Sequence, residues 1–303
     1  MDSHRRAVLL ALFVTVLWSS SWVLIKFGLE DIPALPFAGL RYGLAFLMLV
    51  PFTLRSHHLG ALRRMSAGQW LQLALLGIVF YAITQGAQFV GLFYLPAITL
   101  NLVLNFTAVL VAVLGWVTLS ERPTVGQWLG TALFIGGVLL YFLPVDLPSG
   151  QRIGLLVAVG GMVANALSAV LGRAVNRRLI LSPAVVTVVS MGIGAGLLLI
   201  VGLAVQGLPP LSLANWANIG WLAAVNSALA FTLWNRSLRA LTALESSLIN
   251  STMMIQIPLL AWLFLGERPS GRELVGLLLA ALGVFAVQGL ARRRPRPASS
   301  RHA

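Results

Sequence analysis

Long apolar runs alternate with short polar breaks along the whole chain, and each run is long enough to cross a membrane. A helix needs roughly 20 apolar residues to span the hydrocarbon layer. The runs predict ten helices, at roughly residues 7–28, 36–54, 69–90, 95–118, 125–143, 153–172, 183–205, 218–236, 244–264 and 271–290. Strands of a membrane barrel would alternate polar and apolar positions instead. We therefore expect an all-α polytopic membrane protein with ten transmembrane helices.

Composition supports a lipid environment for these helices. The chain is 58% hydrophobic and 10% charged, whereas a soluble domain has about 25% charged residues. The net charge of +13 would suggest nucleic acid in a soluble protein. Here the basic residues lie between apolar runs, so the expected partner is the lipid bilayer and not nucleic acid. The chain has no cysteine, which excludes disulfides and thiolate metal sites; we expect no cofactor and no metal.

Two segments 146 residues apart share a charged motif. Residues 119–130 read LSERPTVGQWLG, and residues 265–276 read LGERPSGRELVG. The same offset pairs Trp116 with Trp262, Gly130 with Gly276 and Gly137 with Gly283. The register holds without a gap across two predicted helices. The sequence therefore predicts two five-helix units, residues 1–148 and 149–291, followed by a disordered basic tail at 292–303.

An odd number of helices in each unit forces the two units into opposite orientations. Such inverted repeats are common in secondary transporters. Ten spans also place both termini on one side of the membrane. Of the 21 Lys and Arg residues, 16 fall on the side of the termini, 4 on the opposite side and one, Arg41, inside a span. Because basic residues favour cytoplasmic loops, we expect cytoplasmic termini.

With these features, the chain resembles the EamA-type transporters of the drug/metabolite transporter superfamily. The resemblance rests on the two five-helix units and on the Leu-x-Glu-Arg-Pro before the last helix of each. Residues 226–270 are similar to the second EamA repeat over their length. The resemblance implies a bacterial-type inner-membrane protein that exports small metabolites, often amino acids or related compounds. It also implies a cavity lined by helices 1–4 and 6–9, with helices 5 and 10 at the periphery.

Polar and aromatic side chains within the spans are candidates for binding a solute near the middle of the membrane. They lie at helical spacing on several predicted helices. The candidates are Trp18, Ser21 and Trp22; Tyr81, Gln85 and Gln88; Asn101 and Asn105; Asn165 and Ser168; Asn226, Ser227 and Trp234; and Asn250. Interhelical hydrogen bonding is the alternative for the amides and hydroxyls. Anchoring at the membrane interface is the alternative for the tryptophans, Trp234 above all.

Arg41 is a cation within a predicted span. A charge there costs about 2.5–3.5 kcal/mol on insertion scales, which suggests that it binds an anionic group such as a carboxylate. The alternative is that Arg41 snorkels about 8 Å to the outer interface.

Acidic residues within the spans are almost absent. Glu245 is the one acid near a span, and Thr242-x-x-Glu245 is typical of a helix capping box. A buried carboxylate of the kind used in proton relays is therefore missing from the sequence pattern. Uniport, facilitated exchange and proton coupling all stay open.

The repeated motif itself allows two interpretations. Glu121, Arg122 and Pro123 and their counterparts Glu267, Arg268 and Pro269 lead into the last helix of each unit. They can form structural turns, with Pro in the first helical turn, or gates whose salt bridges differ between two states. Gly130, Gly137, Gly276 and Gly283 are typical of close helix packing.

These features favour a secondary transporter whose partner is a small-molecule solute. A carrier of nucleotide sugars or other anionic solutes would require more cations within the spans than Arg41. A membrane enzyme would require a catalytic group, which the spans lack. A non-transporting membrane scaffold is the remaining alternative. The sequence leaves the solute and the oligomeric state open.

Overall fold

The computed structural model of the chain describes residues 3–53, 60, 62–119, 124–143, 149–178, 181–241 and 243–289. All its long elements in this part are helices, as expected from the apolar runs. In chain order they are α1 (Ser3–Gly28), α2 (Ala34–Thr53), α4 (Ala67–Gly77), η1 (Ile78–Thr84), α5 (Gln85–Tyr94), α6 (Ala97–Leu119), α7 (Val125–Phe142), α8 (Ser149–Arg178), α9 (Pro183–Gln206), α10 (Leu213–Ala223), η2 (Ala224–Leu229), α11 (Ala230–Ser237), α12 (Ala243–Ser251), α13 (Met253–Phe264) and α14 (Gly271–Gly289), where η marks a π-helical segment.

Seven helices in the described part are long and apolar enough to cross a membrane. They are His4–Gly28, Ala34–Thr53, Ala67–Tyr94, Val125–Phe142, Ser149–Asn176, Pro183–Gln206 and Glu245–Phe264. The predicted spans 95–118, 218–236 and 271–290 correspond to helical segments at 97–119, 213–237 and 271–289, which lie outside this set. In 213–237 the four asparagines at positions 215, 218, 226 and 235 lower the hydropathy. In its described part the chain is thus all-helical, with helices of the length and composition that suit a membrane.

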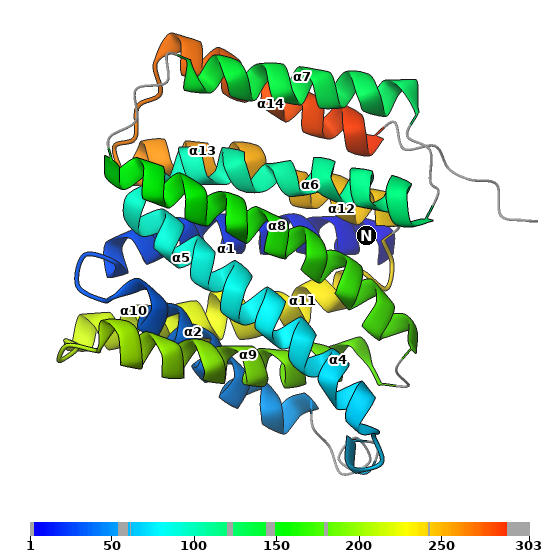
Figure 1. Cartoon of the computed structure of the whole chain (residues 1–303), viewed down its shortest axis with the longest axis vertical. Coiled ribbons are helices and arrows are strands. Elements are labelled where there is room, and N and C mark those ends of the chain that lie inside the picture. The colour runs from blue at the N-terminus through cyan, green and yellow to red at the C-terminus, as the bar shows by residue number, and fades with distance from the viewer. Residues whose placement is uncertain are drawn as a thin grey trace, which may run out of the picture.

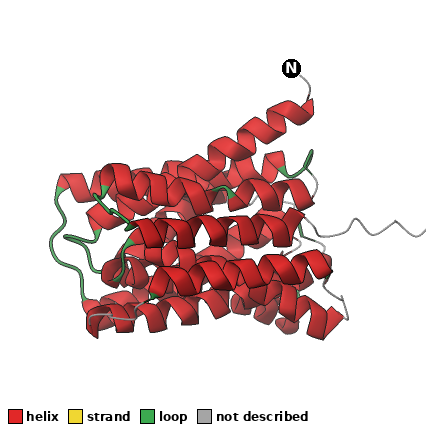
Figure 2. Ribbon diagram, turned by 90° about the horizontal axis from the view of Figure 1, so that it is seen from above, coloured by secondary structure: helices red, strands yellow, loops and turns green. Residues whose placement is uncertain are grey.

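The helices lie side by side as a bundle (Figures 1 and 2). We call the end at which α1 begins the proximal end, and the end at which α1 finishes the distal end. The proximal end also holds the end of α2 and the start of α9; the distal end holds the loops 29–33, 207–212 and 265–270. The start of α1 and the end of α14 therefore both lie at the proximal end.

Two helices, α7 and α14, form a pair at one edge of the bundle (Figure 1). Their backbones approach closely where glycines face each other. A Cβ atom added at Gly137 would lie 2.5 Å from Gly276 O, and one at Gly283 would lie 2.6 Å from Gly130 O. The prediction that these four glycines serve packing is confirmed, because any larger side chain would push the helices apart.

Two long helices contain π-helical segments at corresponding positions. The segment η1 starts at Ile78 and η2 starts at Ala224, 146 residues later, which is the offset of the repeated motif. A π-helix is rare and often marks a functional site. Here α4 and η1 pack on both α8 and α9, whereas the following α5 keeps α8 and packs on α2 in place of α9. Likewise α10 and η2 pack on both α1 and α2, whereas the following α11 keeps α1 without α2. Each π-segment thus lies where a helix loses one of its neighbours.

Several predictions fall on residues that the structure leaves outside its described part. They concern Glu121, Arg122 and Pro123, the capping residue Thr242 and the basic tail at 292–303.

Candidate functional site

A buried arginine connects α2 with η2. Arg41 is 3% exposed. Its Nε donates to Ser227 Oγ at 3.0 Å, and its Nη2 donates to the carbonyl oxygen of Asn226 at 3.5 Å. The guanidinium carbon lies 5.0 Å from the ring centre of Tyr42 and 5.9 Å from that of Phe89. Arg41 therefore points into the bundle, and the alternative that it snorkels to the membrane surface is wrong.

The charge of Arg41 has only neutral partners in the described part of the chain. Its two hydrogen-bond acceptors are a hydroxyl and a carbonyl oxygen, and no carboxylate within the described ranges forms a salt bridge with it. Burying a cation without an anion is costly even when hydrogen bonds and aromatic faces offset part of the penalty. Such a group is suited to receive an anion from outside the protein.

Buried polar and aromatic contacts hold the distal half of α2 against the distal half of the continuous helix Ala67–Tyr94, which α4, η1 and α5 form. Tyr42 Oη donates to Gln85 Oε1 at 2.6 Å. One turn toward the distal end, the rings of Phe37 and Phe89 pack edge to face with centres 5.2 Å apart. Tyr81 packs against Tyr42, with ring centres 5.7 Å apart. The distal end is thus closed between these two helices.

Asn226 and Ser227 present their side chains to two different helices from η2. Asn226 Nδ2 donates to the carbonyl oxygen of Leu17 and, at 3.2 Å, to Ser20 Oγ, both on α1. Ser227 Oγ accepts from Arg41 on α2. Both η2 residues are fully buried. The π-helical segment therefore joins α1 and α2 through neutral side chains.

An aromatic cluster lies between α1 and α11. The ring centre of Trp18 is 5.5 Å from that of Phe231 and 5.1 Å from that of Trp234. Trp234 therefore packs within the protein, in contact with another helix, although its position near the end of a span also suits an interfacial anchor. Trp22 is buried in the main core, and Ser21 Oγ donates to the carbonyl oxygen of Trp18 at 2.6 Å.

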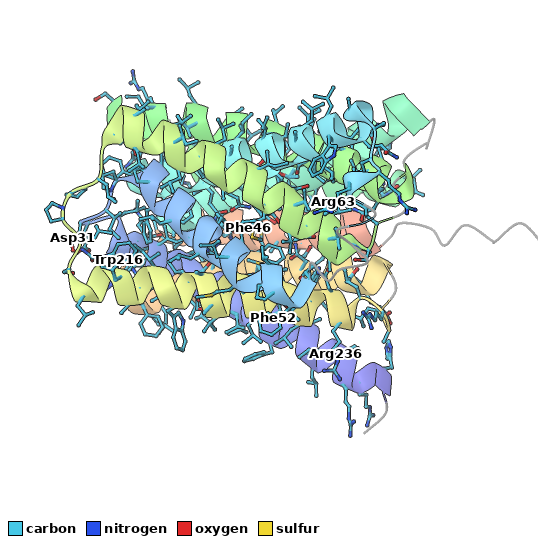
Figure 3. All side chains as sticks on the ribbon, turned by 90° about the horizontal axis from the view of Figure 1, so that it is seen from below. Asp31, Phe46, Phe52, Arg63, Trp216 and Arg236 are labelled. Atoms are coloured by element: carbon cyan, nitrogen blue, oxygen red, sulfur yellow. The ribbon has the colours of Figure 1, made fainter. Side chains whose placement is uncertain are left out.

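A cavity of about 1060 Å³ opens between α2, α9 and the η2–α11 segment. Leu49, Val188 and Phe231 are among its apolar lining residues, and Arg236 and Arg239 are its basic ones. Figure 3 views this side of the molecule, with Phe52 and Arg236 at the proximal end and Asp31 and Trp216 at the distal end. Because Phe52 and Arg236 both line the cavity, its mouth is proximal.

A second polar contact joins α6 to α8. Asn105 Nδ2 donates to Asn101 Oδ1 at 3.0 Å, so the predicted amide pair forms. Asn165 Nδ2 donates to Thr107 Oγ1 at 3.4 Å. Ser168 Oγ donates to the Asn165 carbonyl oxygen at 2.7 Å. The Nδ2 of Asn101 itself is buried and has no hydrogen-bond partner among the described residues, which leaves a donor within the bundle.

Sequence reasoning missed a third polar contact, between α1 and α13. Gln256 Oε1 accepts from Ser19 Oγ at 2.9 Å. Gln256 Nε2 donates to Thr15 Oγ1 at 3.1 Å and to Thr252 Oγ1 at 2.9 Å. The signal was present, because Gln256 is an amide in the apolar run MMIQIPLL. Tyr42, next to Arg41, was missed in the same way.

Glu267 binds the start of another helix. Its Oε1 accepts from the backbone N–H of Ala97 at 2.6 Å, and its Oε2 accepts from that of Ile98 at 2.9 Å. A carboxylate at a helix N-terminus satisfies unpaired N–H groups and complements the helix dipole. Glu267 therefore ties the loop before α14 to α6 through two backbone N–H groups. Arg268 and Pro269 line a neighbouring pocket of about 280 Å³.

The remaining candidates lie away from these contacts. Gln88 is half-buried on α5, without a hydrogen bond to another described residue. Asn250 is exposed on α12. Glu245 lies 3.3 Å from His4 Nε2 at the proximal end. The structure thus brings Arg41, Tyr81, Gln85, Asn226 and Ser227 together around α2, and it places Asn101, Asn105, Asn165 and Ser168 at a separate helix contact.

Comparison with known proteins identifies the family. The model of the EamA-like transporter family matches residues 5–143 and 152–288. The chain belongs to this family. Its relatives include an uncharacterized transporter YvbV of Bacillus subtilis, 34% identical over 56% of this chain and 54% of that one. A probable amino-acid metabolite efflux pump of Escherichia coli is 27% identical over 93% of this chain and 94% of that one. The fold is shared with a solved crystal structure of 18% identity, with a TM-score of 0.64, over 95% of this chain and 99% of that one. The protein is therefore a multi-pass membrane transporter.

Proposed function

We propose that the protein is a secondary transporter of the inner membrane that exports small metabolites by alternating access. The observation that carries this proposal is the difference between the two ends of the bundle. A cavity of about 1060 Å³ has its mouth at the proximal end, whereas Tyr42 and Gln85 join α2 and α5 toward the distal end. A route that is open at the proximal end and closed between α2 and α5 toward the distal end is what alternating access requires.

The repeat offset of 146 residues relates the open proximal end to the closed α2–α5 contact. If residues 1–148 and 149–291 are inverted repeats, α5 corresponds to α11 and α2 to α9. Tyr42 and Gln85 hold α2 and α5 together. In the second pair of helices, by contrast, Val188 of α9 and Phe231 of α11 both line the cavity. Phe231 is the counterpart of Gln85 at the offset of 146. We infer that closing α9 against α11, with opening of α2 from α5, gives the opposite state.

Two observations support the inverted repeats. The family model matches each half separately, at 5–143 and 152–288, and η1 and η2 begin 146 residues apart. The excess of basic residues on the side of the termini supports a cytoplasmic proximal end. The cavity then faces the cytoplasm, as the first step of export requires.

The proposed solutes are amino acids or related amphipathic compounds. The name of the Escherichia coli relative as a probable amino-acid metabolite efflux pump supports this class. So do the Trp18, Phe231 and Trp234 rings beside buried amides and hydroxyls. A carrier of nucleotide sugars is disfavoured, because Arg41 is the one buried cation among the described residues.

Solute flux in proteoliposomes tests the proposal. The purified protein should release preloaded labelled amino acids faster than protein-free liposomes do. The matched pair Gln85→Leu and Gln69→Leu separates transport from folding, because each variant removes one hydrogen bond. The Gln85 bond belongs to the α2–α5 contact, whereas the Gln69 bond caps the start of α4. Gln85→Leu should reduce flux and Gln69→Leu should not. Correctly folded protein without flux of any metabolite would favour the scaffold alternative.

A further inference from the structure

Arg41 makes fewer hydrogen bonds than its side chain offers. A guanidinium has five N–H donors in a planar fork. In the described part of the chain, two bonds are formed, to Ser227 Oγ and to the Asn226 carbonyl oxygen. Both acceptors are neutral, and the side chain is buried. The site therefore holds a fixed positive charge with remaining donors and without a protein carboxylate.

The cavity extends to the same turn of η2 that carries these acceptors. Ala224 and Ala228 line the cavity, and Ala228 directly follows Ser227 in the chain. On α2, the lining residues Met48 and Leu49 lie two helical turns from Arg41 toward the cavity mouth. Neither Arg41 nor Ser227 is among the described lining residues, so Arg41 lies behind the η2 wall of the cavity, bonded to Ser227.

The charges along this route are of one sign. Arg236 and Arg239 line the cavity at its proximal mouth, and no aspartate or glutamate is present among the described residues that line it. Low-dielectric walls that carry one sign of charge concentrate ions of the opposite sign. A route with cations at both ends, and with apolar and neutral polar walls between them, is suited to an amphipathic anion.

We propose that Arg41 and Ser227 bind the carboxylate of the transported solute. This inference rests on the proposed function and names the chemical group that its site recognises. The guanidinium fork matches a carboxylate with two parallel hydrogen bonds, and Ser227 Oγ, released from Arg41, donates to the same group. The apolar part of the solute lies at the inner end of the cavity, against Ala224 and Ala228.

A single cation distinguishes a carboxylate from a phosphate. A phosphate monoester carries a charge of about −1.5 to −2 at pH 7, and Arg41 is the one buried cation in the described part of the bundle. A monocarboxylate is neutralised by one guanidinium. The neutral carboxamide of the same solute has the same shape but offers no charge to Arg41.

The test compares matched solutes on wild-type protein. The proteinogenic amino acids are offered as free acids and as carboxamides, with isopentyl phosphate as a further probe. Binding is measured as the shift in melting temperature of the detergent-purified protein, and transport is measured as efflux from proteoliposomes. At least one free acid should stabilise the protein, its carboxamide should bind at least about tenfold more weakly, and isopentyl phosphate should give no shift.

Variants assign the effect to Arg41. Arg41→Gln should abolish the stabilisation by the free acid and reduce its efflux at least about tenfold. The control Arg63→Gln removes an exposed cation outside the cavity lining and should behave as wild type. If Arg41→Gln does not fold, Ser227→Ala replaces it and should weaken binding of the free acid relative to the carboxamide.

The outcomes separate the two proposals. Carboxylate-dependent stabilisation without efflux would remove the transport proposal and leave the carboxylate site. Efflux in which carboxamides or isopentyl phosphate equal or exceed the free acids would leave transport and overturn the carboxylate site. Unchanged binding of the free acid by folded Arg41→Gln, or no stabilisation by any free acid, would also overturn it.

Discussion

At the scale of single residues, the bundle is specified by a small set of buried polar contacts. Membrane helices gain little from hydrophobic burial against each other, because lipid is as apolar as the helix surface. Specific hydrogen bonds such as Tyr42–Gln85 and Ser19–Gln256 therefore fix which helices pair. Each is worth on average about 0.6 kcal/mol in membranes, so several acting together determine the arrangement.

Tyr42→Phe removes one of these contacts without changing the ring. The Oε1 of Gln85 then loses its donor at 2.6 Å. The variant should lower the unfolding free energy by about 0.6–2 kcal/mol and increase the exposure of the distal ends of α2 and α5. Melting of the purified protein measures the first effect. The control is Tyr94→Phe, which alters a 37% exposed tyrosine. Equal melting temperatures for both variants would contradict the role of the Tyr42–Gln85 bond.

Glu267→Gln tests the carboxylate at the start of α6. The amide keeps one acceptor but loses the charge that complements two backbone N–H groups of Ala97 and Ile98. We expect a loss of about 1 kcal/mol in stability, measured as a lower melting temperature. The exposed Glu30, in the loop after α1, provides the control variant Glu30→Gln. If that variant were destabilised to the same extent, the helix-capping explanation would fail.

At the scale of elements, close packing and π-helical segments divide the bundle into parts. The α7–α14 pair is held by glycine-mediated backbone contact at the edge of the molecule. By contrast, the helices 67–94 and 213–237 each lose one neighbour at their π-segment. The edge pair is suited to remain a fixed unit, while the two interrupted helices line or close the solute route.

Adjacent glycines on α7 give a matched test of the edge pair. A Cβ atom at Gly137 would lie 2.5 Å from both Ala280 N and Gly276 O, whereas one at Gly136 meets nothing within 4 Å. Gly137→Ala should therefore force α7 and α14 apart and lower the melting temperature. Gly136→Ala should leave it unchanged or raise it, because alanine favours a helix by about 0.8–1.0 kcal/mol over glycine. A higher melting temperature for Gly137→Ala would refute the close contact.

Sequence reasoning was reliable where a signal is local and failed where partners are distant in the chain. Apolar run length predicted the helices, and helical spacing predicted the Asn101–Asn105 pair and the facing glycines. The π-segments carry no composition signal, since they differ from an α-helix by the hydrogen-bond register alone. Glu267 finds its partners 169 and 170 residues away, and no spacing rule identifies such a contact.

At the scale of the whole molecule, the proposed direction of transport depends on how the bundle is oriented. The cavity mouth, the start of α1 and the end of α14 all lie at the proximal end. If that end is cytoplasmic, the state described here receives solute from the cell and the Tyr42–Gln85 contact closes the outer side. If that end is external, the same structure would present its cavity to the outside. The orientation therefore decides which gate the α2–α5 contact represents.

The absence of native cysteine allows a direct test of orientation. Arg63 and Arg268 are both exposed, the first near the proximal end of α4 and the second in the distal loop before α14. An impermeant maleimide applied to intact cells should label Arg268→Cys, whereas Arg63→Cys should be labelled only after the membrane is permeabilised. Because both sites are exposed, a difference in labelling reports membrane side and not burial. The reverse pattern would place the cavity mouth outside and, with it, would reverse the assignment of the inner and outer gates.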